Sequence, residues 1–137
     1  MVPFKILKKF DIENEDQLTN NNNNYTYAYN CWGFTRFVYE KGNLYWEASQ
    51  NMEEWLASNT RKIKKLKIGD IGVMKNYSSL THTFIIVNPK QNSIIHKCGA
   101  RPLSYGTIEE ERKNGNLEGY GKIVEYRRFK KKRESVI

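Results

Sequence analysis

The stretch NCWGFTRFVYE, residues 30–40, constrains the fold more than any other part of the chain. Its apolar side chains recur at the i, i+3 and i+4 spacing of an amphipathic helix. Asn30 is a good N-cap residue, and Gly42 is a typical residue just after a helix end. The helix begins at Cys31, where the amides and dipole of a helix N-terminus favour a thiolate. The face expected to point inward holds Cys31, Phe34, Phe37 and Val38, and the side chains expected to point outward are Arg36, Glu40 and Lys41.

From Ile63 onward the apolar pattern changes to the period of two that is typical of strands. Strands are expected over residues 63–66, 71–75, 81–87, 93–98 and 120–128. Further helices are expected over residues 45–57 and 107–114, the latter opened by Thr107 with three glutamates in its first turns. A helix followed by an antiparallel sheet predicts an α+β fold. We expect one domain over residues 1–137, with its core at about 25–128 and a basic tail at 129–137.

The chain has only two histidines, His82 and His96, and each lies in one of two successive predicted strands. The turn sequence NPKQN joins these strands into a hairpin. If Val87 pairs with Gln91, the histidines lie directly opposite each other. A shift of two residues makes them diagonal neighbours on the same face, and a β-bulge would break the inference.

A thiol and two facing imidazoles can make an acyl-transfer site. One imidazole takes the thiol proton and later protonates the leaving group, while the other holds the first in place. The helix head supplies N–H groups for an oxyanion. We therefore predict Cys31 as nucleophile, His82 as base and His96 as orienting residue, although spacing alone does not decide which histidine is the base. The structural alternative is a buried small cysteine and two packed core histidines.

A zinc site would use nearly the same residues. Cys31, His82, His96 and Cys98 have the composition of a tetrahedral site. No C-x-x-C or H-x-x-x-H pair is present, and His96 and Cys98 are a poor chelating pair. The spacing therefore argues against zinc, and we expect neither a metal nor a cofactor.

The chain is strongly basic, with 23 Lys and Arg against 15 Asp and Glu and a net charge of +8. Such a surface suits an anionic partner, whether wall polymer, membrane or nucleic acid. The basic run at 130–133 makes a nucleic-acid-binding module an alternative, but the aromatic residues follow core patterns rather than a stacking platform. No apolar run approaches the ~18 residues of a membrane span, and the N-terminal segment has too many lysines for a signal peptide. We expect synthesis in the cytoplasm, with any delivery elsewhere carried out by other machinery.

Three segments, in this order, resemble the NlpC-type cysteine peptidases, which are cell-wall endopeptidases of the papain-like clan. NCWGFTRFVY is similar to the family's nucleophile helix, D-C-x-G-F/L-V, and Trp32 to the form found in members associated with phage tails. KIGDIGVM is similar to the family's G-D-L/I-V strand. THTFIIVNPKQNSIIH is similar to its H-V-G-I-Y-L-G-N-G-K-x-I-H hairpin.

The resemblance implies a papain-like α+β fold with the nucleophile helix packed on a small antiparallel sheet. Carried over by position, it implies Cys31 as nucleophile, His82 as base and His96 as third polar residue. The family cleaves amide bonds in peptidoglycan stem peptides, commonly beside γ-D-glutamyl, through a Cys thioester and without a metal. A tyrosine before the nucleophile often helps to form the oxyanion site, and the candidates here are Tyr25, Tyr27 and Tyr29.

The chain also departs from the family pattern. Asn30 replaces the usual Asp, and Thr83 and Phe84 replace the V-G after the base, which predicts a bulkier cleft wall. These departures concern the substrate more than the catalytic pair. A phage-tail or lysin-like enzyme, or a delivered antibacterial effector, fits the wall-peptidase prediction. The alternatives are a toxin-type protease, deamidase or acyltransferase that acts on proteins, and a non-catalytic binding domain.

Overall fold

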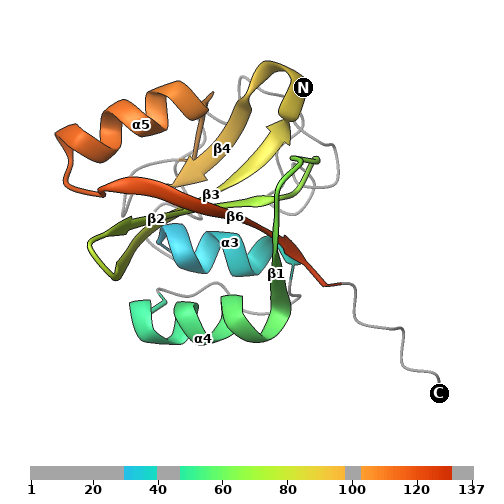
Figure 1. The fold of residues 1–137 in the computed structure, drawn as a ribbon, viewed down its shortest axis with the longest axis vertical. Helices are drawn as coiled ribbons and strands as arrows, with labels where there is room; N and C mark the ends of the chain where they lie inside the picture. Colours follow the sequence, from blue (N-terminus) through green and yellow to red (C-terminus); the bar gives the residue numbers. More distant parts are fainter. Residues whose placement is uncertain (1–29, 40–46, 98–102, 131–137) are drawn as a thin grey trace.

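The computed structural model describes residues 30–39, 47–97 and 103–130, without the side chains of 37, 97 and 103. The described helices are α3 (Cys31–Tyr39), α4 (Ser49–Asn59), the short 3-10 helix η1 (Pro89–Gln91) and α5 (Ile108–Leu117) (Figure 1). The described strands are β1 (Thr60–Ile63), β2 (Ile71–Asn76), β3 (Ser79–Asn88), β4 (Ser93–Lys97), β5 (Leu103–Thr107) and β6 (Lys122–Phe129).

The strands form one antiparallel sheet in the order β1-β6-β2-β3-β4-β5. In Figure 1, α4 and α5 lie on opposite sides of the sheet. Helix α3 contacts β3 and β4, and α4 packs directly on β2 and β3. This arrangement confirms the predicted α+β class. Among the described residues, no helix has the length and apolar character needed to cross a bilayer.

Helix α3 begins where the sequence predicts it. The Gly33 amide donates to Asn30 Oδ1 at 2.9 Å, which is an N-cap bond, and the Phe34 amide donates to the Asn30 carbonyl at 2.8 Å. Cys31, Phe34 and Val38 are buried as predicted. Arg36 is only partly exposed because its guanidinium pairs with Glu47, which corrects the expectation that it points outward. The other outward positions, Glu40 and Lys41, and the predicted helix end, Gly42, lie outside the described residues.

Two apolar clusters cover the two faces of the sheet. One joins α4 to β2 and β3 and consists of Met52, Trp55, Leu56, Ile71, Val73 and Leu80. The other reaches α5 and consists of Met74, Phe84, Ile86, Ile94 and Ile108. A bulge in the β2–β3 ladder pairs Met74 with His82 but Lys75 with Leu80. The extra residue explains why Leu80 packs beneath α4 while His82 faces α5.

Several predicted boundaries are wrong. Strand β1 covers Thr60–Ile63 rather than 63–66, and α5 extends three residues past the predicted end at 114. Strand β5 was not predicted, because LSYGT has a weak alternating pattern and gains its stability from pairing with β4. The predicted cap of α5 is confirmed, since the Glu110 amide donates to Thr107 Oγ1 at 3.2 Å.

The register of the β3–β4 hairpin also differs from the predicted one. Ile85 pairs with Ile95, so the same register continued places Phe84 opposite His96. The reason is the turn, in which η1 is followed by Asn92 in the left-handed conformation at φ 53°. The turn closes at Asn88 and Ser93 instead of Val87 and Gln91. The histidines are therefore diagonal neighbours on one face, as the two-residue shift requires.

Gly115 allows α5 to lie directly against the backbone that precedes β6. A Cβ there would lie 2.2 Å from the Gly121 carbonyl oxygen and 2.8 Å from Met74 Cε. Gly115→Ala is expected to lower the free energy of unfolding by about 1–3 kcal/mol, because backbone must move. Urea denaturation measures the change. Gly106→Ala is the matched control, since the nearest atom to its added Cβ is 3.7 Å away, and an equal loss in both variants would contradict the packing argument.

Candidate active site

Cys31 occupies the first position of α3 and is held against β3 through its own carbonyl group. That oxygen lies 3.0 Å from Thr35 Oγ1 and 3.3 Å from Thr83 Oγ1, and the two hydroxyls are 2.8 Å apart. Each hydroxyl has one proton, so one donates to the carbonyl and the other to its neighbour. Thr35 and Thr83 are fully buried. The pair fixes the head of α3 beside the strand residue that follows His82.

Thr83 and Phe84 do not form a cleft wall, which corrects the expectation drawn from the sequence. Both side chains are fully buried. Phe84 packs against Gly72, where an added Cβ would lie 2.1 Å from the ring, and its ring meets Tyr126 edge to face. These departures from the NlpC pattern therefore change the packing beneath the site rather than its surface.

His82 is enclosed and 1% exposed. Its ring stacks on Tyr120 with centroids 4.7 Å apart and an interplanar angle of 9°. His96 stands edge-on to it, with ring centroids 5.9 Å apart and an angle of 88°. The two imidazoles therefore meet on one face of the sheet, as predicted, but perpendicular to each other.

Glu111 of α5 lies between the two histidines. Its Oε2 is 3.0 Å from His82 Nε2, and its Oε1 is 3.1 Å from His96 Nδ1. The residue is 0% exposed. The distances suit hydrogen bonds, but His82 Nε2 and both carboxylate oxygens are buried without an aligned hydrogen bond. The His82–Glu111 contact is a charge pair, and His96 makes a close polar contact with the other oxygen of the same carboxylate.

The pKa directions agree with this assignment. Burial lowers the pKa of His82, but the hydrogen bonds and charges of Cys31 and Glu111 outweigh burial and raise it to about 9. Burial raises the pKa of Glu111, but the His82 hydrogen bond and the two histidines bring it below its ordinary value. Burial lowers the pKa of His96, and Glu111 only partly offsets this. Near neutral pH the cluster thus holds an imidazolium at 82, a carboxylate at 111 and a neutral imidazole at 96.

The structure brings Cys31, His82 and His96 into one region and adds Glu111. A side-chain hydrogen bond with Cys31 is one of the interactions that raise the pKa of His82. Since Nε2 of His82 faces Glu111, Nδ1 is the nitrogen left for the thiol. The Glu111 carboxylate, rather than His96, lies beside His82 Nε2. His96 contacts the other oxygen of the same carboxylate. Other residues named from the sequence, Cys98, Tyr25, Tyr27 and Tyr29, lie outside the described residues.

Sequence reasoning missed Glu111 as a site residue. It was assigned to the acidic first turns of α5, where carboxylates favour the helix dipole. The available signal was its spacing, because Ile108, Glu111 and Gly115 form the buried stripe of this helix. A carboxylate on an apolar stripe has to be paired, and the paired group is then a site candidate.

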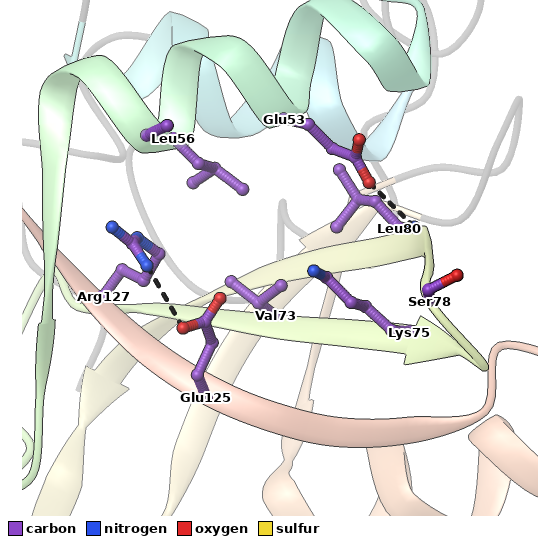
Figure 2. A pocket seen from close by; sticks show the side chains of 9 residues that line it. Glu53, Leu56, Val73, Lys75, Ser78, Leu80, Glu125 and Arg127 are labelled. Carbon is purple, nitrogen blue, oxygen red and sulfur yellow. Dashed lines mark hydrogen bonds and ion pairs between the residues drawn. The ribbon is translucent and has the colours of Figure 1, made fainter.

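A hollow of about 310 Å³ lies elsewhere, between α4 and strands β2 and β6. Figure 2 shows Leu56 above it, Val73 on its floor, and the Glu125–Arg127 pair at one side. None of Cys31, His82, His96 and Glu111 lines it. This hollow and the cluster of Cys31, His82, His96 and Glu111 are thus separate, and the candidate site is the cluster.

Comparison of the chain with protein-family models, curated proteins and solved structures finds no match. The NlpC resemblance therefore stays a prediction that rests on the three sequence segments.

The His82 imidazole is expected to titrate near pH 9. Its pKa is raised above the ordinary value of about 6.5, so the imidazolium persists through neutral pH and is lost as pH rises through about 9. His96 is expected to titrate below pH 6.5, because burial lowers its pKa. NMR of the protein with isotope-labelled histidine, in EDTA, measures both. Two ordinary midpoints near pH 6.5 would contradict the buried charge pair.

Proposed function

We propose that this chain is a papain-like cysteine hydrolase of the NlpC type that cleaves amide bonds in peptidoglycan stem peptides. The observation that carries the proposal is the order Cys31–His82–Glu111. The thiol interacts with the buried imidazole of His82, and Nε2 of that ring lies 3.0 Å from the carboxylate of Glu111. This is the arrangement in which a thiol nucleophile, its base and an orienting group work together.

The proposed reaction passes through a thioester. The Cys31 sulfur attacks the amide carbonyl carbon, and the proton held on His82 passes to the leaving amine as the C–N bond breaks. Water then loses a proton to His82 and attacks the thioester, which releases the acid and restores the thiol. Glu111 keeps its charge throughout and stabilises the imidazolium. His96 contacts the other oxygen of Glu111, so it acts on His82 only indirectly, as a residue that positions Glu111.

The head of α3 is the candidate oxyanion site. Asn30 already accepts the amide of Gly33, and its carbonyl accepts that of Phe34. The amides of Cys31 and Trp32 are therefore the first-turn donors that can point at a developing oxyanion.

The substrate class rests on the sequence resemblance and on charge. The net charge of +8 favours encounter with anionic peptidoglycan and teichoic acids. Mass spectrometry of purified peptidoglycan after incubation with the protein tests the proposal, with Cys31→Ala as the control. We expect muropeptides cut at a stem-peptide amide only with the wild type. If wall material stays intact while protein substrates are cleaved, deamidated or acylated, the substrate proposal is wrong. Salt-dependent binding to nucleic acid without either reaction would favour the nucleic-acid module instead.

Selective alkylation of the cysteines distinguishes a catalytic site from a non-catalytic binding domain. Cys31 is expected to react with iodoacetamide faster than Cys98, because it lies at the head of α3 beside His82, the predicted base. His82→Ala is expected to slow the labelling of Cys31 at least tenfold and to leave that of Cys98 unchanged. Peptide mapping after timed quenching measures each rate. Equal and slow labelling of Cys31 and Cys98 would indicate a non-catalytic binding domain.

A further inference from the structure

We infer that His82, Glu111 and His96 form a binding site for one zinc ion, distinct in its ligands from the cysteine-containing site considered from the sequence. The inference rests on geometry and on the chemistry of the donors. Each residue supplies one ligand atom, and these atoms all lie within 4.8 Å of one another. Two imidazoles and one carboxylate are a ligand set that zinc uses in proteins, with a fourth position left open.

The distances in the cluster are close to those that the ion requires. Ligand atoms around a tetrahedral zinc stand about 3.3 Å apart, given bond lengths near 2.0–2.1 Å. The contact from His82 Nε2 to Glu111 Oε2 is 3.0 Å, and the contact from His96 Nδ1 to the other oxygen, Oε1, is 3.1 Å. With one ligand atom from each residue, the three atoms lie within 4.8 Å of one another, so side-chain rotations have to close the widest separation around the ion.

The unaligned contacts are the second observation. His82 Nε2 and both oxygens of Glu111 are buried, in contact, and without an aligned hydrogen bond. Near neutral pH His82 Nε2 carries a proton, so zinc has to displace that proton before the nitrogen can act as a ligand. The close grouping of these three buried atoms is the feature that favours a metal ion.

The identity of the ion follows from donor type and burial. Imidazole nitrogens disfavour Mg²⁺ and Ca²⁺, which prefer oxygen. The same donors occur in six-coordinate iron sites, but these leave positions open for several small ligands. Here His82 is 1% and Glu111 0% exposed, and Tyr120 stacks over the His82 ring. Enclosure on this scale favours four-coordinate zinc.

Zinc at this site would inhibit the proposed hydrolase, and this consequence alone rests on the proposed function. The ion would occupy Nε2 of His82 and leave its remaining proton on Nδ1, so the ring could not accept another from the thiol. Zinc would also take the carboxylate that orients the base. The site would therefore switch the enzyme off, rather than supply a cofactor.

Titration of the metal-stripped full chain with ZnCl₂ against a chromogenic chelator tests the inference. One equivalent of zinc is expected to bind, and Mg²⁺ is expected to fail. Glu111→Gln and His96→Ala should weaken zinc binding at least about 100-fold, whereas Glu109→Gln, an exposed neighbour on α5, should not. Cys31→Ala should bind zinc like the wild type. Iron(II) bound in preference to zinc, or binding lost in Cys31→Ala but kept in His96→Ala, would overturn the inference.

Co²⁺ substitution keeps the test valid if a variant fails to fold. The wild type and Cys31→Ala should give the same d–d bands without a thiolate charge-transfer band. A thiolate band in the wild type, or no cobalt spectrum at all, would overturn the assignment. Peptidoglycan cleavage is measured separately in EDTA, so failure of the proposed function does not affect the zinc result.

Discussion

Cys31→Ala is expected to abolish muropeptide release, with a fall in rate of about 10⁵- to 10⁶-fold. The thioester cannot form without the sulfur, and water attacking directly would lack a nucleophile held beside His82. The substitution removes one small buried group, and Thr35 and Thr83 still hold the carbonyl of residue 31. The fold should therefore survive, and circular dichroism checks this.

The rate is measured by chromatographic quantification of muropeptides over time. Cys98→Ala is the control, because it removes the other thiol of the chain. Retention of wild-type rate by the Cys31→Ala variant would end the cysteine-hydrolase proposal, whatever products are formed.

Glu111→Gln is expected to lower the rate of muropeptide release by about 10²- to 10⁴-fold. The amide keeps the size of the side chain but removes the charge that stabilises the His82 imidazolium. The hydrogen bond and charge of Glu111 both raise the pKa of His82, so the His82 midpoint should move from about 9 towards lower pH. A merely structural role for Glu111 would lower stability without this shift in the NMR titration.

Glu109→Gln is the matched control for that experiment. Glu109 lies in the same helix and carries the same group, but it is exposed and pairs with Arg112. Its substitution should leave both the rate and the His82 midpoint within error of the wild type. If the two variants behave alike, Glu111 does not orient the base.

The elements predicted best from the sequence are those with strong local signals. The Asn30 cap, the helix that follows it and the cap at Thr107 are all confirmed. Strands β2 and β3 were located because their Val- and Ile-rich runs are buried on both faces. Strands β1 and β5 were misplaced or missed because tertiary pairing, rather than local pattern, stabilises them.

Local sequence rules predicted only part of the site, namely the shared face of the two histidines. Period-two alternation placed His82 and His96 on one face of the sheet. That placement is confirmed although the predicted register is wrong, because a shift of two residues keeps each side chain on the same face. The register itself depended on the left-handed Asn92, which the sequence does not specify. Glu111 was missed because its helix packs across the sheet from another part of the chain, and only its position on a buried stripe indicated that it points inward.

The position of β6 in the sheet affects how the protein is made. This strand comes late in the chain, at Lys122–Phe129, yet it lies between β1, which ends at Ile63, and β2, which ends at Asn76. A nascent polypeptide halted before Lys122 would leave β1 without a neighbour and β2 with an open edge. Contacts so distant in sequence slow folding. Strand β6 must therefore be synthesised before the sheet that carries His82 can be completed, so the proposed site is expected to assemble late in translation.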